Sequence, residues 1–325
     1  MREAANHKTK SRQVDILLAT YNGDKYLRQQ IDSILNQTYE NWKLIVRDDG
    51  STDNTTSIIE GYRDIVPDKI VVLNDDLGKL GVTNNFAKLL EHSQSDYTML
   101  ADQDDIWLPR KIELTYNKMR GLVEKHSGDV PLLVYTDYKI VDANMCVIID
   151  SYWKRMKIDP KSARSLARSL VFNVTSGCTI MINRKLRDLS LPMPADIFFH
   201  DWWLGLVSTA VGKNDYVQEA TLLHRIHATN VAGFQSNASI NAIVSQFRGL
   251  SRLKRETRVY LIGTQKQAMA LSSRYEDILN DKDFEKISTY ANLDSFNPVI
   301  KRFYILKHGF WWYGIMRNVA LLLVI

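Results

Sequence analysis

The chain has 325 residues, of which 45% are hydrophobic and 24% are charged. This balance excludes a disordered or fibrous protein and allows a large core, and the length predicts one large domain with an appendage, or two domains. The net charge is +5, but residues 236–325 alone hold 13 Lys and Arg against 7 Asp and Glu. This uneven charge favours an anionic surface met by the C-terminal region and excludes a generally basic nucleic-acid binder.

The N-terminal segment and the cysteine content narrow the class of protein further. Residues 1–13 are polar and lack the apolar stretch of a signal peptide, so we expect a flexible arm there. Two cysteines make no disulfide framework, which predicts a reducing compartment. No run reaches the roughly 18 apolar residues that a membrane-spanning helix needs.

The first hundred residues alternate β-type runs with helical patterns. Strands are predicted at 14–19, 44–46, 70–73 and 97–100, and helices lie between them over 27–35, 55–62 and around 86–90. This order predicts an α/β fold with a mostly parallel sheet flanked by helices.

Polar residues follow each predicted strand, as Thr20-Tyr21-Asn22, Asp48-Asp49-Gly50, Asn74-Asp75-Asp76 and Asp102-Gln103-Asp104. Ligands of open α/β sheets bind beyond the carboxyl ends of the strands, so this edge is the predicted site. Neither a dinucleotide-binding glycine motif nor a P-loop occurs, which favours phosphates held by a metal.

Three carboxylates lie within four residues at Asp102, Asp104 and Asp105. Their mutual repulsion is relieved when a hard cation such as Mg²⁺ or Mn²⁺ binds between them, and such a cation can also carry a phosphate. The alternative is an acidic turn that caps the next helix, with Pro109 near its first turn. The spacing alone leaves both interpretations open.

Two segments carry a family resemblance, DILLATYNGDKYLRQQIDSILNQTYENWKLIVRDDGSTDNT and ADQDDIW. They resemble the inverting family-2 glycosyltransferases of the GT-A fold. HDWWLGLVSTAVG and HRIHATNVAG also resemble the rhamnosyltransferase-like branch of bacterial cell-surface polysaccharide synthesis. The likeness runs from about residue 14 to about residue 233. It implies a GT-A domain over 14–235, followed by a helical C-terminal region over 236–325.

The resemblance implies that the nucleotide of the donor is bound by Thr20, Tyr21, Asn22, Asp48, Asp49 and Asp102. It also implies Mn²⁺ or Mg²⁺ as a cofactor, with Asp104 and His227 as ligands. His224 departs from the branch, which commonly has an aromatic residue there. The relative roles of His224 and His227 therefore stay open, as does a purely structural role for His227.

The resemblance assigns Asp201 as the general base, which takes the proton of the acceptor hydroxyl as it attacks the anomeric carbon. The alternative is a helix N-cap ahead of residues 202–211. Trp202 and Trp203 are candidates for stacking on the acceptor sugar, against a plain role in the core.

The branch favours dTDP-L-rhamnose as donor and a lipid-linked glycan as acceptor. A UDP-hexose or UDP-N-acetylhexosamine transferase is the alternative within the same enzyme class. A non-catalytic sugar-nucleotide-binding subunit of a polysaccharide complex is the alternative outside it, although a scaffold has no need of Asp102, Asp104 and Asp201 together.

The C-terminal region combines Trp311 and Trp312 with Lys301, Arg302, Lys307 and Arg317. Basic residues beside aromatic residues suit a helix that lies in an anionic membrane surface. We therefore expect a cytoplasmic protein, peripheral on the inner face of the cell membrane. The alternative is packing of this region against the catalytic domain or against a second copy in a homo-oligomer.

Overall fold

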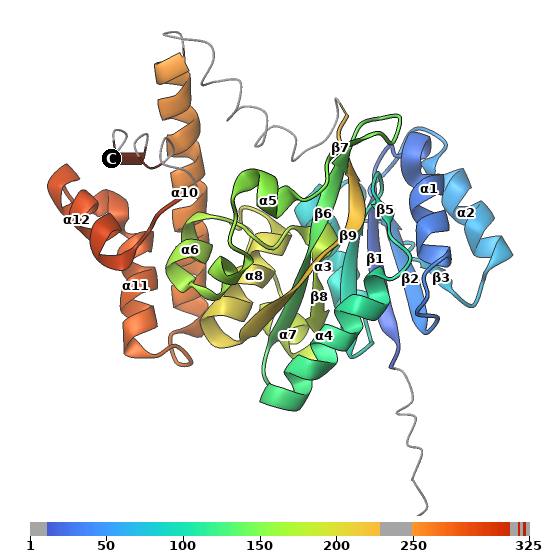
Figure 1. The fold of residues 1–325 in the computed structure, drawn as a ribbon, viewed down its shortest axis with the longest axis horizontal. Helices are drawn as coiled ribbons and strands as arrows, with labels where there is room; N and C mark the ends of the chain where they lie inside the picture. Colours follow the sequence, from blue (N-terminus) through green and yellow to red (C-terminus); the bar gives the residue numbers. More distant parts are fainter. Residues whose placement is uncertain (1–11, 228–248, 313–317, 319–320, 323–325) are drawn as a thin grey trace, which may run out of the picture.

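The computed structural model describes residues 12–227, 249–312, 318 and 321–322 (Figure 1). Arg317 and the predicted domain boundary at residue 235 lie outside these ranges. The described strands are β1 (Val14–Thr20), β2 (Trp42–Asp48), β3 (Ile70–Val72), β4 (Tyr97–Asp102), β5 (Ile106–Trp107), β6 (Leu132–Val141), β7 (Val147–Ile149), β8 (Met181–Asn183) and β9 (Lys213–Arg225).

The helices that flank the sheet are α1 (Asp24–Leu35), α2 (Thr55–Ile65), α3 (Val82–His92), α4 (Lys111–His126), α5 (Tyr152–Met156), α6 (Leu166–Val171), α7 (Arg184–Ser190) and α8 (His200–Val211). The C-terminal helices are α10 (Gly249–Tyr275), α11 (Asp281–Ala291) and α12 (Pro298–His308). Three short 3-10 helices are η1 (Pro160–Arg164), η2 (Gly177–Thr179) and η3 (Leu293–Ser295).

One sheet runs through the molecule in the order β3-β2-β1-β4-β8-β6-β9-β5, and β7 pairs with β6. The first four strands pair in parallel, as their alternation with helices predicts. The α/β fold is confirmed, but the sheet as a whole is mixed. Strands β8, β5 and β7 pair antiparallel, because the strand–helix alternation that enforces parallel pairing stops after β4.

Two hydrophobic cores cover the two faces of the sheet. Alternation along β1 directs Ile16 and Leu18 into a core with α1, α2 and α4, while Leu17 enters the opposite core with α3, α6 and α8. Burial on both faces explains why β1 is a continuous apolar run rather than an alternating one.

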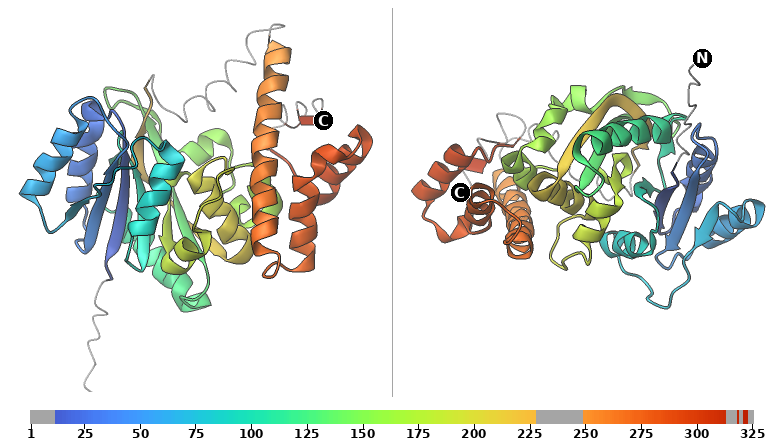
Figure 2. Two further views of the ribbon diagram at one scale, coloured as in Figure 1. Left: turned by 180° about the vertical axis from the view of Figure 1, so that it is seen from behind. Right: turned by 90° about the horizontal axis from the view of Figure 1, so that it is seen from below.

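The C-terminal helices extend the second core at one end of the molecule (Figures 1 and 2). Leu261 and Tyr275 of α10 and Ile287 of α11 are buried in the cluster that contains Trp203 of α8. The described part of the C-terminal region therefore packs against the catalytic domain. Within the described residues, no helix combines the length and the apolar character that crossing a membrane requires.

The predicted membrane-facing tryptophans turn inward. Trp311 and Trp312 are only partly exposed and pack against the second core, and the ring of Trp312 lies 5.3 Å from that of Tyr260. These two indoles contact the protein, which contradicts the prediction that they face a membrane, because Trp312 packs on Tyr260 of α10. Other apolar residues of the C-terminal region are exposed. They lie on α12, as Val299, Ile300, Phe303 and Leu306, and on or after α10, as Val259, Ile262, Met269 and Ile278.

Candidate active site

The parallel strands bring their carboxyl ends to one edge of the sheet. In the register of β1, Thr20 lies beside Asp48 of β2, and Ala19 lies beside Asp102 of β4. The polar residues that follow these strands are therefore neighbours in space, as predicted from the order of the elements.

Asp48 is occupied by its own surroundings. One carboxylate oxygen accepts hydrogen bonds from the hydroxyls of Thr20 (2.8 Å) and Ser51 (2.6 Å), and the other accepts from the backbone N–H groups of Gly50 and Ser51. Thr20 is itself buried. Both residues hold the turn after β2 against the end of β1.

Asn22 supports the same turn from the other side. Its φ of 48° places it in the left-handed region that asparagine tolerates better than most residues. Its side-chain oxygen accepts the N–H of Thr52 (2.8 Å), and its own N–H donates to the hydroxyl of Ser51. Its side-chain oxygen is therefore engaged within the turn.

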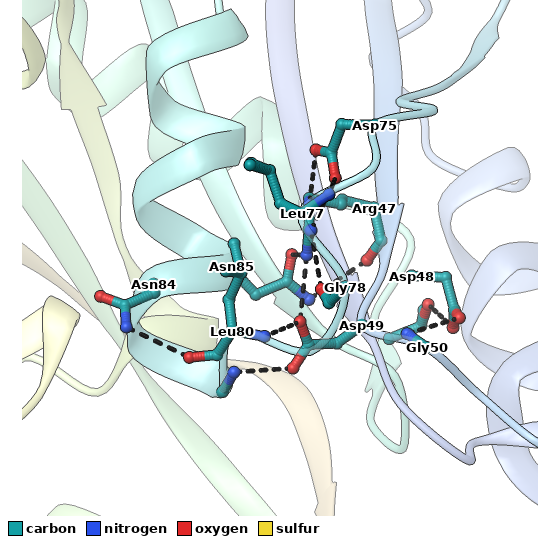
Figure 3. A network of polar contacts seen from close by, with 12 residues as sticks. Arg47, Asp48, Asp49, Gly50, Asp75, Leu77, Gly78, Leu80, Asn84 and Asn85 are labelled. Carbon is teal, nitrogen blue, oxygen red and sulfur yellow. Dashed lines mark hydrogen bonds and ion pairs between the residues drawn. The ribbon is translucent and has the colours of Figure 1, made fainter.

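Asp49 lies in a buried polar network around Arg47 (Figure 3). Its carboxylate accepts hydrogen bonds from Arg47 (3.0 Å) and from the backbone N–H groups of Leu80 (2.7 Å) and Gly81 (2.8 Å). Arg47 also binds both carboxylate oxygens of Asp75 at 2.8 Å. Asp49 therefore fixes the loop after β3, and this partner set was not visible in the sequence.

Tyr21 is an accessible predicted nucleotide residue, as Asn22 is, with 39% of its surface exposed. Its backbone N–H donates to the side chain of Gln103 (2.9 Å), which donates back to the Tyr21 carbonyl (3.0 Å). Gln103 belongs to the acidic motif after β4. The end of β1 and the acidic motif are therefore held together by one amide side chain.

The acidic motif pairs with two histidines at the end of β9. Nε2 of His227 lies 2.7 Å from a carboxylate oxygen of Asp104, and Nδ1 of His224 lies 2.8 Å from one of Asp105. The two histidines therefore have different partners, since each contacts a different carboxylate. The acids do not cap α4, whose N-cap residue is Arg110, so the helix-cap interpretation is not supported.

The electrostatics of the motif are dominated by the burial of several acids close together. Desolvation, together with the charges of Asp105 and Asp104, raises the pKa of Asp102 well above 3.8. Desolvation and the charge of Asp105 also raise the pKa of Asp104. Burial alone would lower the pKa of His224, but Asp105 raises it to about 9, so this imidazole is protonated at neutral pH.

Beneath the motif, Asp105, Cys178 and His224 bring three potential ligand atoms within 4.8 Å of one another. Lys111 is buried beside them, and burial lowers its pKa to about 8. Lys111 and protonated His224 already place positive charge beside these ligand atoms. We therefore assign Asp105, Cys178 and His224 a structural role beneath the acidic motif. The buried position of Lys111 was not predicted, since a lysine at a helix start is usually exposed.

Arg225, between the two histidines, is also buried. Its guanidinium donates to the backbone carbonyl of Asp104 (3.2 Å), to that of Ala143 (3.2 Å) and to the side chain of Gln29, and it lies 4.3 Å from the ring centre of Tyr26. It therefore positions the backbone of the acidic motif.

Asp201 lies in the first turn of α8, whose N-cap residue is Phe199, so Asp201 is not the N-cap. One carboxylate oxygen accepts from Asn173 (3.1 Å) and the N–H of Gly177 (2.8 Å), and the other accepts from the N–H of Trp202 (2.7 Å). These donors orient the carboxylate, and each oxygen has two lone-pair positions, so the oxygen facing Trp202 keeps one. Asn173 was missed because it lies 28 residues upstream in an irregular segment.

Trp202 and Trp203 belong to the core. They are 2% and 0% exposed, and their indole N–H groups donate to the backbone carbonyls of Ser169 and Ser190. Neither ring face is available to a sugar, so this geometry contradicts the acceptor-stacking prediction. The tryptophans instead attach the first turn of α8 to α6 and α7.

Asp201 lies close enough to the acidic motif for its charge to contribute to the raised pKa of Asp102, although desolvation and the charges of Asp105 and Asp104 contribute more. Its carboxylate also accepts the N–H of Gly177 in η2, the segment that contacts β4. Asp201 and the motif at the end of β4 are therefore candidates for a common site.

The residues present fit a divalent cation. Asp104 offers a carboxylate and His227 an imidazole nitrogen, and both donor types bind Mn²⁺. The raised pKa values of Asp102 and Asp104 indicate carboxylates whose mutual repulsion a cation would relieve. Asp104 and His227 would hold the ion, with Asp102 nearby.

Comparisons with known proteins identify the family. Residues 15–188 match the model of glycosyl transferase family 2. An uncharacterised glycosyltransferase of Rickettsia prowazekii is 29% identical over 266 residues, 79% of this chain and 77% of that protein. The dTDP-rhamnosyl transferase RfbG of Shigella flexneri is 26% identical over 236 residues, 69% of this chain and 76% of that protein.

The fold has counterparts among solved structures. Residues 1–349 of TarS from S. aureus, in complex with UDP-GlcNAc, superpose with a TM-score of 0.55 at 15% identity, covering 88% of this chain and 74% of that one. This similarity shows the fold alone, and the family match extends over more than half of the chain. The chain therefore belongs to glycosyl transferase family 2 and is a glycosyltransferase with a GT-A-like fold.

Proposed function

We propose that this glycosyltransferase is an inverting, metal-dependent enzyme that transfers a sugar from a nucleoside diphosphate to a hydroxyl acceptor. The observation that supports it most is the single site formed by Asp201, the acid cluster and His227. These are a proton acceptor and a cation-binding set on one edge of the sheet.

The chemistry assigned to the residues is a single displacement. The acceptor oxygen bonds to the anomeric carbon, the bond from that carbon to the diphosphate breaks, and Asp201 takes the acceptor proton. Asn173 and Gly177 hold the carboxylate in position for this transfer. A bound Mn²⁺ or Mg²⁺ supplies positive charge that stabilises the departing diphosphate.

For the donor we propose dTDP-L-rhamnose, and for the acceptor a lipid-linked glycan of a cell-surface polysaccharide. The support is the resemblance of the motifs to the rhamnosyltransferase-like branch and the 26% identity to a dTDP-rhamnosyl transferase. A UDP-hexose or UDP-N-acetylhexosamine transferase is the second candidate, favoured by the fold shared with TarS, whose complex contains UDP-GlcNAc.

Thermal stabilisation of the full chain by nucleotide sugars tests this proposal. We expect dTDP-rhamnose with Mn²⁺ or Mg²⁺ to raise Tm more than UDP-glucose or UDP-N-acetylglucosamine, because only a bound donor stabilises by mass action. A larger shift with a UDP-sugar would replace the donor assignment. Stabilisation by a nucleotide sugar without any turnover would favour the non-catalytic subunit.

We also propose that the enzyme is peripheral on the inner face of the membrane, attached through α12. Asn297 is the N-cap residue of the helix, and its side chain accepts hydrogen bonds from the N–H groups of Val299 and Ile300. Gly309 is the C-cap residue. Val299, Phe303 and Leu306 are 75%, 57% and 61% exposed. The helix carries three basic residues and no acidic one, which suits anionic lipid.

Flotation with anionic vesicles tests the attachment. The double variant Phe303→Asp/Leu306→Asp should stay in solution, while Ile65→Asp, an exposed apolar residue on α2, should float with wild type. If wild type does not float and elutes as a dimer that the double variant disrupts, α12 is a subunit interface instead.

A further inference from the structure

Exposed basic side chains gather on α5 and on the turn that follows it. Residues 152–164 hold five basic residues and one acidic residue. Four of the basic residues, which we call the α5 basic patch, are exposed, namely Lys154, Arg155, Lys157 and Lys161. We propose that this patch binds the anionic headgroups of a membrane and turns the edge of the sheet that carries the acidic motif toward the lipid. The inference rests on the proposed function, because it names the surface that brings the site to a lipid-linked acceptor.

The charges of the patch are not used inside the protein. Among the residues that the structure describes, none of the four side chains forms an ion pair or donates a hydrogen bond. The fifth basic residue, Arg164, pairs with Asp215 instead. The acidic residue of the segment, Asp159, caps η1 by accepting the N–H of Lys161 (3.0 Å). The patch therefore presents its positive charge to a partner outside the chain.

Helix α5 is fixed at the edge of the sheet that holds the candidate active site. Strands β4 and β6 both pair antiparallel with β8, so they end at the same edge. Near the end of β6, the carboxylate of Asp137 accepts hydrogen bonds from the hydroxyl of Ser151 and the N–H of Trp153 (3.2 Å). Trp153 is buried, and α5 packs beside β6 (Figure 1). A surface that meets α5 therefore meets this edge.

Two aromatic contacts connect α5 to the acidic motif. The ring of Tyr152, the first residue of α5, stacks on that of Tyr138 with the ring centres 4.5 Å apart. The ring of Tyr138 lies edge-on to that of His224 at 5.5 Å, and His224 contacts Asp105. The α5 basic patch therefore begins two rings away from a histidine of the site.

The backbone does not explain why Lys157 is a lysine. Lys157 is the C-cap residue of α5 and has a φ of 54° and a ψ of 37°, in the left-handed region. Glycine is the usual residue at such a helix end and asparagine the next, because a Cβ is disfavoured there. The N–H of Lys157 donates to the carbonyl of Lys154 (3.2 Å), so the two ammonium groups extend from one turn. A negatively charged surface gives this pair a role.

The composition of the patch suits a lipid surface better than a single bound phosphate. Three of its four residues are lysines, whose ammonium groups are hydrated point charges on flexible stems. A single phosphate is typically held by the parallel N–H groups of an arginine, whereas clustered exposed lysines suit the spread charge of anionic headgroups. Each basic residue near such a surface strengthens binding about fivefold.

Co-sedimentation of the full chain with vesicles tests the patch. The vesicles contain phosphatidylcholine alone or an equal mixture with phosphatidylglycerol. We expect Lys154→Gln/Lys157→Gln to bind the mixed vesicles about 25-fold more weakly than wild type, because two charges are removed. Lys43→Gln/Lys125→Gln is the matched control, since it removes the same charge from two exposed lysines toward the opposite edge of the sheet, near the starts of β2 and β6. The control should bind like wild type.

Energy transfer to a dye-labelled lipid in the mixed vesicles tests the orientation. Cys146 is exposed in the turn after β6 and Cys178 is buried, so a fluorophore can be attached at Cys146 alone. Transfer from this position should exceed transfer from a fluorophore at Lys43→Cys in a Cys146→Ser background. Equal transfer from the two positions would overturn the proposed orientation.

The outcomes separate this inference from the function on which it rests. Equal weakening in the patch variant and the control pair would assign the effect to net charge and overturn the patch. Release of wild type by inorganic phosphate at constant ionic strength would replace the lipid with a single anion. If the patch variant binds like wild type while Phe303→Asp/Leu306→Asp does not bind, attachment through α12 stands and this inference alone fails. If wild type binds neither vesicle, both membrane attachments fail, and stabilisation by nucleotide sugars still decides the proposed donor.

Discussion

Two acidic pairs lie at the carboxyl ends of β2 and β4, the two strands that flank β1. Asp48 and Asp49, at the end of β2, accept hydrogen bonds from backbone N–H groups, hydroxyls and Arg47. Asp102 and Asp104, at the end of β4, have pKa values raised by desolvation and by the neighbouring acids, although Asp104 also contacts His227. The first pair accepts hydrogen bonds from its own loops, whereas burial among other acids disfavours the charged form of the second.

This difference implies different roles for the aspartates at the carboxyl ends of β2 and β4. A carboxylate that is already satisfied stabilises the loops around it, and its loss lowers the free energy of unfolding. A carboxylate buried among other acids costs stability until a cation supplies charge, so its loss affects binding and turnover more than folding. Asp201 accepts three hydrogen bonds, as Asp49 does, but its side chain is only partly buried.

We expect the largest effect on turnover from substitution of Asp201. Asp201→Asn should lower kcat about 1000-fold while the nucleotide Kd stays within about threefold, because the base acts on the acceptor. Single-turnover transfer and calorimetry measure the two quantities. Asp129→Asn, on an exposed turn, is the matched control. A variant that keeps a tenth of the wild-type rate would remove Asp201 from the role of base.

We expect substitution in the acid cluster of Asp102 and Asp104 to act through metal binding. Asp104→Asn is expected to lower kcat/KM about 100-fold and to abolish the part of nucleotide affinity that depends on Mn²⁺, with little change in the unfolding midpoint. Titrations with and without the metal give this difference. Nucleotide affinity that rises equally with Mn²⁺ in wild type and variant would assign the motif a structural role.

We expect substitution of Asp49, in the first pair, to lower the stability of the fold. Asp49→Ala removes one partner of buried Arg47 and frees two backbone N–H groups, so the free energy of unfolding should fall by about 2 kcal/mol. Urea denaturation measures this loss. Asp76→Ala, an exposed acid in the loop after β3, should change it little. A variant of normal stability that has lost nucleotide binding would show that Asp49 contacts the donor itself.

The N-terminal half of the fold was predictable from the sequence. Apolar runs and helical periodicity predicted the four N-terminal strands, β1 to β4, because short-range patterns determine such elements. The parallel order then placed Asp102 and Asp104 at the same edge as Thr20 and Asp48. Topology alone was enough for that step.

What the sequence did not reveal depended on partners distant along the chain. The hydrogen-bond donors to Asp49 come from Leu80 and Gly81, 31 and 32 residues away. Trp202 and Trp203 were weighed as sugar-stacking residues, but their N–H groups find carbonyls on α6 and α7. No local pattern reveals which side chain a buried donor will meet.

The attachment of α8 has a consequence for protein engineering. The indole N–H groups of Trp202 and Trp203 bind the backbone carbonyls of Ser169 and Ser190. The position of Asp201 on α8 therefore depends on α6 and α7. A chimaera that grafts α8 alone into a relative would leave both N–H groups without their carbonyls. Exchanging residues 166–211 as one block keeps these bonds and transplants the base in register with its own supports.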